Sequence, residues 1–424
     1  MIYFIREHKD KLNGYSLEKK WLEYINNPNR YHPFSAHGDE YIEDLINIIS
    51  FQEYLSLTKT PEDSFFYIFQ IRDPYIAFHA DFNILDYIDN KDIISYLQTG
   101  EIQILVLLGL EEFNIFNLDY VGVPRHDVRN FYEHTPIGLI ECHLNKYNIP
   151  TKHFHYASPL YKPMINENIH KLKTMGVSNN FNFYMYDSFI NQYSDLCNYY
   201  NPSIDSPIDV KTTKLYSCLN YGIPKKHRSE MVYQLWKNDL LEYGNVSLKE
   251  TLGDYDVEFT KLLPLKLDGK VNHHYSFDNN LIIHTEKELL DDTFIYISCE
   301  THLEGNVCYI TEKTWKAILH KKPFFIIGDN GSLAKLRDMG FRTFDKWWNE
   351  DYDYYDDNRK IEFVIYVLKK LAKKSPSERK LWFDACGDIN EVLDHNYKTL
   401  KSYKDKMISE FLEQLQDNYQ ATSP

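Results

Sequence analysis

The stretch "CYITEKTWKAILHKKPFFIIGDNGSLAKLRDMGF", from Cys308 to Phe341, decides the fold that the sequence predicts. It begins as the end of a buried strand and continues into a helix. It then reaches a second buried strand at "PFFIIG", before a Gly-Ser turn opens another helix. Short apolar runs that alternate with helical patterns are typical of parallel sheets covered by helices. The stretch therefore predicts an α/β fold, with Glu312, Lys313 and Lys316 near the start of a helix.

The same alternation continues on both sides of this stretch. The run "GEIQILVLLGLEEF" (100–113) has the nearly continuous apolar character of a parallel strand that is buried on both faces. Residues 1–100 give a clear strand pattern at "FFYIFQIRD" and little else. Further strands are predicted over residues 151–158, 180–189, the start of "TKLYSCLNYG" and 291–301, and helices over 128–148, 359–374 and 389–416.

The length of the chain and one polar stretch predict its domains. A chain of 424 residues is too long for a single hydrophobic core. The segment "NYYNPSIDSPID" (198–209) is rich in Asn, Pro, Ser and Asp, as linkers are. We therefore expect Rossmann-like domains over 1–205 and 206–400, then a helix and tail over 401–424. Ligands of such folds bind beyond the carboxyl ends of strands, here in a central cleft that the two sheets face.

Composition excludes several classes of protein. The net charge of -15 and pI of about 5.6 oppose attraction of the whole chain to nucleic acid or to anionic membranes. No apolar run approaches the ~20 residues of a membrane span, and the first residues meet charge too early for a signal peptide. The six cysteines form no Cys-x-x-Cys pair. We expect reduced thiols and a cytoplasmic location.

A basic turn follows one predicted strand. In "CLNYGIPKKHR" (218–228) the strand ends near Leu219, and Pro224 suits the first position of a helix. Residues 225–228 then place three fixed cations and a histidine in the first turn. Cations are unfavourable there because the helix dipole is already positive, so an anion such as a diphosphate is indicated. A solvated basic turn is the alternative interpretation.

A second group of charged residues surrounds the start of the helix predicted after Thr311. Glu300 ends one strand, Thr311 can cap the next helix, and Glu312 and Lys313 follow it. A carboxylate beside an ammonium can bind ribose hydroxyls and a phosphate oxygen together. The alternative is that Glu312 only complements the helix dipole, or forms a surface salt bridge with Lys316 four residues later.

Together these motifs resemble a known family. "YITEKTWKAILHKKPFFIIG" is similar to a segment of the GDP-fucose-using α1,3-fucosyltransferases. It is closer still to related glycosyltransferases of phages and giant viruses, in which "EKTWKPI…PFI…G-x-x-G-S-L" recurs. "CLNYGIPKKHR" resembles the segment of the same group that ends in P-x-x-H-R. The resemblance covers about residues 213–400. Ala317 departs from the viral pattern, where proline is usual.

This resemblance implies a GT-B fold with the nucleotide-sugar donor on the C-terminal domain. It implies that Arg228 binds the diphosphate, that Glu312 binds the ribose, and that Lys313 lies by the nucleotide or phosphate. It also implies transfer without a metal or other cofactor, and a viral chain would act in the host cytoplasm. The predicted donor-binding residues are Asn220, Lys225, Arg228, Glu300, Thr311, Glu312, Lys313 and Lys316.

An inverting transferase also needs a base that removes a proton from the acceptor hydroxyl. Glu111 and Glu112 follow the strongest strand pattern of the N-terminal half, and the relatives carry an acidic residue there. We expect Glu111 to be the base, with Glu112 as the second choice. Ordinary solvated loop acids are the alternative.

The acceptor and the absence of a metal rest on weaker signals. "DYD" occurs at 254–256 and 351–353, but short Asp-Tyr runs are expected in an acidic, tyrosine-rich chain. "HFH" at 153–155 is a weak metal signal, because no cysteine or acidic partner stands at a familiar zinc spacing. The acceptor is predicted to be a glycan or a hydroxymethylated base in phage DNA. The remaining alternatives are a nucleotide-sugar or glycan-binding module without activity, and another nucleotide-binding enzyme such as an epimerase. No Gly-x-Gly-x-x-Gly supports the last of these.

Overall fold

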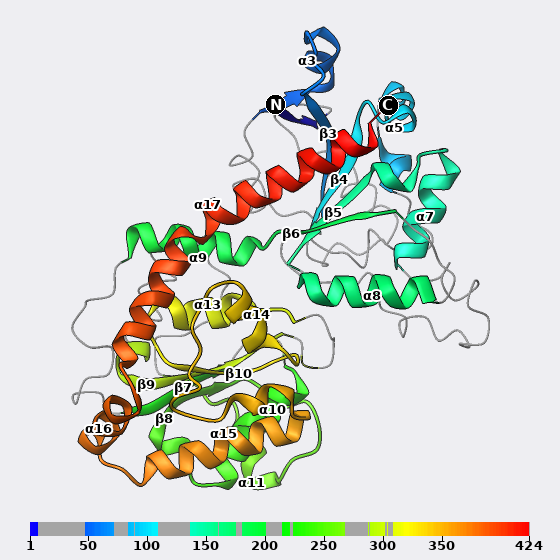
Figure 1. The fold of residues 1–424 in the computed structure, drawn as a ribbon. Coiled ribbons are helices and arrows are strands. Elements are labelled where there is room, and N and C mark those ends of the chain that lie inside the picture. The colour runs from blue at the N-terminus through cyan, green and yellow to red at the C-terminus, as the bar shows by residue number, and fades with distance from the viewer. Residues whose placement is uncertain are drawn as a thin grey trace. The chain divides into compact units, whose positions relative to one another are not determined.

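The computed structural model describes residues 1–6, 47–71, 84–88, 90–108, 136–159, 161–174, 180–200, 214–220, 224–267, 287, 289–301, 303 and 308–423. The chain divides into two compact units (Figure 1). Unit 1 comprises Met1–Ser188 together with Asp405–Pro424, and unit 2 comprises Phe189–Lys404. Each unit contains a parallel sheet, so the predicted α/β class with Rossmann-like units is confirmed.

In the described part of unit 1, six parallel strands form a sheet in the order β2-β1-β3-β4-β5-β6. Strand β4 is buried from Gln103 to Leu107, as its apolar run predicts. The predicted strands in this half correspond to β3–β6. The strands are β1 (Ile2–Arg6), β2 (Ile48–Ser50), β3 (Ser64–Ile71), β4 (Gln103–Leu108), β5 (Phe154–Ser158) and β6 (Asn182–Met185).

Helices occupy the connections between these strands. They are α3 (Phe51–Ser56), α5 (Asp92–Thr99), α7 (Pro136–Lys146) and α8 (Lys162–Thr174), with short 3-10 turns η2 (Ile84–Tyr87) and η3 (Thr151–His153). Helix α5 ends at Gly100, whose φ of 87° closes the turn before β4. Strand, helix and parallel strand follow one another, as expected for βαβ units.

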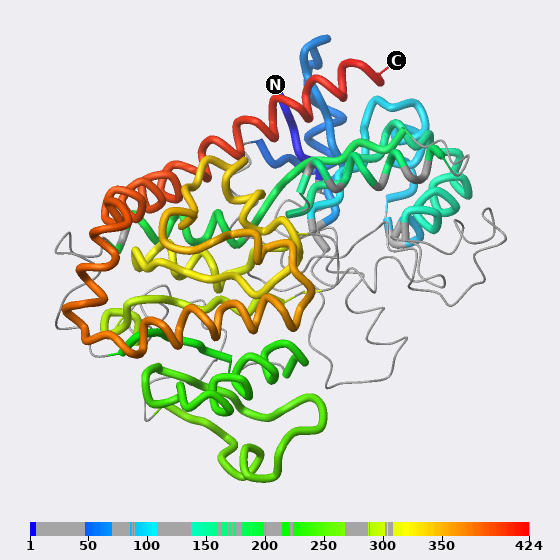
Figure 2. The backbone as a smooth tube through the Cα atoms, turned by 60° about the horizontal axis from the view of Figure 1, so that its bottom comes forward, coloured from blue at the N-terminus to red at the C-terminus, as the bar shows by residue number. Residues whose placement is uncertain are grey.

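The end of the chain belongs to unit 1. Helix α17 (Ile389–Thr422) is drawn in orange to red in Figure 2. Its last turns form hydrogen bonds with polar side chains of the sheet of unit 1. Gln103 Nε2 donates to Thr422 Oγ1 at 3.0 Å, and Asn418 Nδ2 donates to the Tyr184 hydroxyl at 2.9 Å. His155 lies between Gln103 and Tyr184, at 2.5 and 2.7 Å. Burial lowers the pKa of His155 to about 3, so its ring is neutral in this network.

The division of the chain therefore differs from the expected one. It falls between Ser188 and Phe189 and not near residue 205, and residues 405–424 are part of unit 1 and not a separate tail. The reason is packing. Helix α9 (Ser188–Tyr199) is tied to the first half of α17, where Tyr397 donates to the carbonyl of Tyr200 at 2.6 Å. The second half of α17 packs Phe411 against Tyr184, with ring centres 5.6 Å apart.

In the described part of unit 2, four parallel strands form a sheet in the order β10-β9-β7-β8. They are β7 (Lys214–Asn220), β8 (Gly244–Leu248), β9 (Thr293–Cys299) and β10 (Phe324–Ile327). Helices α13 (Glu312–Leu319) and α14 (Ser332–Asp338) cover one face of the sheet (Figure 1). Helices α10 (Lys226–Lys237) and α15 (Asp357–Ala372) cover the other. Smaller elements are η4 (Leu241–Tyr243), α11 (Val257–Thr260), η5 (Glu350–Tyr354) and α16 (Pro376–Cys386).

The predicted strand end at Cys308–Ile310 is wrong. The strand stops at Cys299, and these three residues form a buried loop before α13. The φ of Cys308 is 58°, a left-handed conformation that a strand cannot hold. Its N–H instead donates to Asp329 Oδ2 at 3.1 Å. The helix and strand that follow are as predicted. None of the described helices is long and apolar enough to cross a membrane.

Candidate functional site

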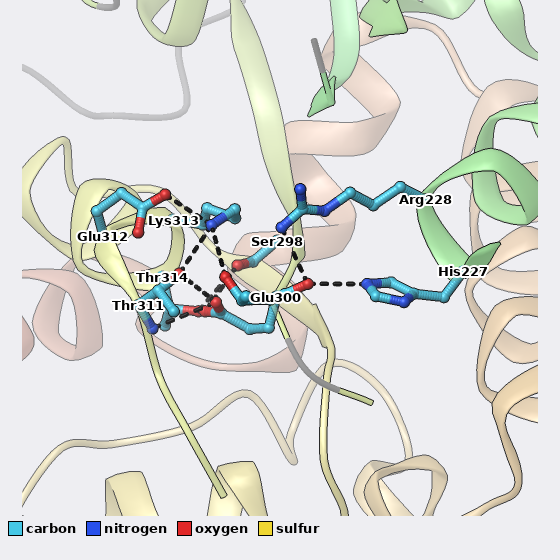
Figure 3. A network of polar contacts seen from close by, with 9 residues as sticks. His227, Arg228, Ser298, Glu300, Thr311, Glu312, Lys313 and Thr314 are labelled. Atoms are coloured by element: carbon cyan, nitrogen blue, oxygen red, sulfur yellow. Dashed lines mark hydrogen bonds and ion pairs between the residues drawn. The ribbon is translucent and has the colours of Figure 1, made fainter. Parts of the chain in front are cut away.

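The candidate site lies at the carboxyl ends of β7 and β9. Strand order reverses between these two neighbours, because β7 leads to β8 on one side and β9 leads to β10 on the other. Such a switch point is where open α/β sheets bind ligands. Asn220 ends β7 and Glu300 follows β9, while α10 and α13 begin close by (Figure 3). The structure therefore gathers the predicted donor-binding residues in one part of unit 2.

The carboxylate of Glu300 is enclosed by hydroxyl and amide donors. Its Oε1 accepts from Thr314 Oγ1 at 2.6 Å and from Ser298 Oγ at 3.2 Å. Its Oε2 accepts from the backbone N–H of Thr311 at 3.2 Å and also from the Thr311 hydroxyl. The residue is fully buried. Glu300 thus fixes the start of α13 to the end of β9, and its side chain faces protein donors instead of an open site.

The backbone carbonyl of Glu300 holds the other helix. It accepts from His227 Nε2 at 2.8 Å and from Arg228 Nη2 at 3.2 Å. Both side chains come from the first turn of α10 and are buried, with 9% and 6% of their surfaces exposed. One residue therefore joins the starts of α10 and α13, through its carbonyl on one side and its carboxylate on the other (Figure 3).

Glu312 and Lys313 form the exposed side of this cluster. Lys313 Nζ lies 2.6 Å from Glu312 Oε1 and donates to Thr311 Oγ1 at 3.0 Å. The side chains remain 25% and 15% exposed, so both can reach a ligand. Burial alone would raise the pKa of Glu312, but the charges of Lys313 and Lys316 outweigh it and lower that pKa to about 2. The first turn of α13 therefore presents a permanent carboxylate beside an ammonium.

The charges of cations at the starts of both helices act on His227. Burial lowers the pKa of His227, its hydrogen bond to Glu300 opposes this, and the charges of Arg228, Lys225 and Lys313 lower it further, to about 4. The imidazole is therefore neutral at pH 7 and serves as a hydrogen-bond donor to Glu300. Because it lies where two helices begin and carries fixed cations, this part of unit 2 is a candidate site for an anion.

We expect this histidine to make unit 2 sensitive to acid. Because the pKa of His227 falls from 6.5 to about 4 on folding, the unfolded chain binds the proton more readily between these values. The stability that this histidine contributes is full above pH 6.5 and is lost as the pH falls towards 4. His227→Gln keeps an N–H donor without the titration, so its urea midpoint should fall less than that of the wild type over this window.

The matched control is His170→Gln, an exposed histidine of α8 in unit 1. This change should leave the pH dependence of unit 2 as it is in the wild type. If wild type and His227→Gln lost the same amount of stability between pH 6.5 and 4, His227 would not be the cause of the acid sensitivity.

Asn220 and Lys316 are buried, as Arg228 is, and the interactions described for them are with protein groups. The Asn220 amide nitrogen lies 3.2 Å from the Cys218 sulfur and 3.6 Å from the Cys299 sulfur, and the residue is 4% exposed. It therefore joins the ends of β7 and β9. Lys316 is 6% exposed, and its charge acts on Glu312. The i, i+4 spacing suggests that Glu312 pairs with Lys316, but its closest ion pair is with Lys313.

Sequence reasoning overlooked three residues of this cluster. Ser298 and Thr314 complete the enclosure of Glu300, and their hydroxyls lie 2.9 Å apart. Their positions on adjacent elements give no signal in the sequence. His227 was part of the basic turn but was not assigned to the donor site. Glu111 and Glu112, the predicted bases, lie outside the described residues, so their role stays a prediction.

No metal cluster is formed by the histidine, cysteine and acidic side chains of the part of the chain that the structure describes. In the first "DYD" run, Asp256 accepts a hydrogen bond from the Tyr233 hydroxyl at 3.0 Å. In the second, buried Asp353 accepts one from the N–H of Leu333 at 3.1 Å. Both carboxylates thus stabilise local structure.

Neither a protein-family model nor a curated protein matches this chain. The chain is classified by its fold and site alone, as an α/β protein with two Rossmann-like units. One unit places cations and a carboxylate at the switch point of its sheet.

Proposed function

We propose that the chain is a glycosyltransferase that holds a nucleotide-diphosphate sugar at the switch point of unit 2. The observation that carries this proposal is that Glu300 joins Arg228 of α10 to Thr311, the hydrogen-bond partner of Lys313, next to the partly exposed Glu312 carboxylate. Paired phosphates need fixed cations, and ribose hydroxyls need an acceptor. The cluster offers both at the place where such sheets bind nucleotides.

Each side chain then has a distinct task. Arg228 and Lys225 bind the diphosphate, and Lys313 binds a phosphate oxygen. Glu312, whose low pKa keeps it ionised, accepts from ribose hydroxyls. Glu300 holds Arg228 and Thr311 holds Lys313, Asn220 joins the ends of β7 and β9 beneath them, and the charge of Lys316 helps to keep Glu312 ionised.

The reaction follows from this arrangement. A base removes the proton of the acceptor hydroxyl, the oxygen attacks the anomeric carbon, and the bond to the diphosphate breaks. Charge develops on the departing diphosphate, where fixed cations stabilise it in place of a metal. We propose Glu111 or Glu112 as the base, within a GT-B arrangement that inverts the anomeric centre.

A donor screen tests this proposal. Wild-type protein is incubated with UDP-, GDP- and CMP-sugars, with and without EDTA, and hydrolysis or transfer is followed by mass spectrometry. We expect turnover of one donor class, unaffected by EDTA. Binding of a donor without any turnover would favour a nucleotide-sugar-binding module, and complete loss of activity with EDTA would refute the metal-free mechanism.

For the donor that the screen identifies, Lys313→Ala should raise KM roughly ten- to a hundredfold, because one charge-assisted hydrogen bond is lost. Lys226→Ala is the matched control. Lys226 lies in the first turn of α10 but is exposed, so its removal should change KM less than about threefold. Equal effects of the two variants would show that α10 and α13 attract the donor by net charge alone.

A further inference from the structure

We propose that unit 2 contains a second binding site, for a neutral saccharide. A pocket of about 610 Å³ is lined by residues 345–351 together with Arg337 and Tyr354. Its volume lies within the range of small-molecule sites. None of these residues belongs to the cluster at the carboxyl ends of β7 and β9. The pocket is therefore a separate feature of the same unit.

Three residues of the pocket lining are fixed by contacts with other parts of unit 2 or with each other. Trp347 Nε1 donates to the carbonyl of Phe383 at 2.8 Å. The ring of Trp348 packs 4.3 Å from that of Phe325 in β10. Asn349 caps η5 by accepting from the N–H of Asp351 at 2.8 Å. A lining fixed at each of these points loses little conformational freedom when a ligand binds.

The chemistry of the lining matches that of a sugar ring, which has an apolar C–H face and a rim of hydroxyls. Tyr354 offers an aromatic surface, because 60% of this side chain is exposed. Asp345 and Lys346 are exposed beside it and supply an acceptor and a donor. Asn349 and Asp351 add an amide and a further carboxylate. Aromatic surface with mixed donors and acceptors suits a polyol better than a wholly apolar ligand.

Charge decides between a saccharide and a second nucleotide. The described lining residues include two cations, Arg337 and Lys346, and three carboxylates, so the formal balance is 2 − 3 = −1. Arg337 is already engaged by Glu350, at 2.8 Å. A diphosphate would therefore meet net negative charge here, in contrast to the cationic cluster of the first site. A neutral saccharide would meet no such repulsion.

This inference bears on the acceptor of the proposed function, although saccharide binding does not depend on transfer. If transfer takes place, a saccharide site on the nucleotide-binding unit would retain part of a glycan acceptor. It therefore favours a glycan over a base in DNA as the acceptor class. Failure of the donor screen and failure of saccharide binding are separate outcomes, because each is measured without the other.

The test uses the full chain and a panel of neutral oligosaccharides: chitotriose, maltotriose, cellotriose, mannotriose and lactose. Binding is measured by calorimetry and by indole fluorescence, with and without GDP and UDP. We expect at least one of the five to bind, and neither nucleotide to compete with it. Tyr354→Ala should weaken that binding about tenfold, the scale of one aromatic contact.

Tyr366→Ala is the matched control, because Tyr366 is a 54% exposed tyrosine of α15 that does not line the pocket. It should change the affinity less than twofold. Asp351→Asn, which keeps the size of the side chain, should weaken binding as a second readout. The proposal is overturned if no oligosaccharide binds, if GDP or UDP competes, or if Tyr354→Ala binds as the control does.

Discussion

Replacing Arg228 with alanine is expected to lower kcat/KM for sugar transfer by roughly a hundred- to a thousandfold, the usual effect of removing a fixed donor from developing charge. Arg228 is 6% exposed and is held by the Glu300 carbonyl at 3.2 Å, so its guanidinium has little freedom to be elsewhere. Initial rates over a range of donor concentrations, with the donor found in the screen, measure this effect.

Two further variants make the result specific. Lys226→Ala removes an exposed cation from the same turn of α10 and should keep kcat/KM within about threefold. Arg228→Lys keeps the charge but not the planar fork, and should recover only part of the activity. Full activity of Arg228→Ala, in a sample whose thermal unfolding matches that of the wild type, would refute the role of Arg228 in the donor site.

Replacing Glu300 with alanine is expected to reduce the free energy of unfolding of unit 2 by about 3–5 kcal/mol, because removal of this fully buried carboxylate leaves several buried donors unpaired at about 1–3 kcal/mol each. The partners are the hydroxyls of Ser298 and Thr314 and the hydroxyl and N–H of Thr311. Urea unfolding followed by tryptophan fluorescence reports on this unit, which contains Trp236, Trp315, Trp347, Trp348 and Trp382.

Glu312→Ala serves as the comparison, since its side chain is partly exposed and its loss should cost about 1 kcal/mol or less. Glu300→Gln separates positioning from folding. It keeps the shape of the side chain but turns one acceptor into a donor that faces Thr311 or Thr314. Where this variant folds, donor KM should rise more than kcat falls. A loss below about 1 kcal/mol for Glu300→Ala would contradict the described role.

The sequence predicts well the elements that have strong periodicity. Strands β4, β9 and β10 are continuous apolar runs, and α15 carries its buried residues at helical spacing, so burial alone specifies them. Strands β1 and β2 are short and lie where the pattern is weak. Strand β8 is "GNVSL", in which Asn245 and Ser247 interrupt the apolar signal. Such strands are specified by their neighbours in the sheet more than by their own residues.

The site shows the same division. Charged residues that follow strands identify where a parallel sheet binds ligands, so Arg228, Glu312 and Lys313 could be found from their positions. The direction in which a side chain points cannot be predicted from its position after a strand. Glu300 turns inward because Thr311 and Thr314 of the following helix supply donors, and only the packing of α13 on β9 brings them there. Likewise, the pattern of α17 shows that the helix is amphipathic but not which sheet it covers.

Helix α17 has a consequence for the order in which the protein folds during synthesis. Strands β1 to β6 leave the ribosome first, but Gln103 and Tyr184 acquire their partners Thr422 and Asn418 only when the end of α17 has been made. Unit 2 is one continuous segment and can fold before that point. Domains generally fold from the N-terminus onward as the chain emerges. Here the unit that is begun first is the last to be completed, because its sheet gains the contacts of α17 only when that helix has been translated.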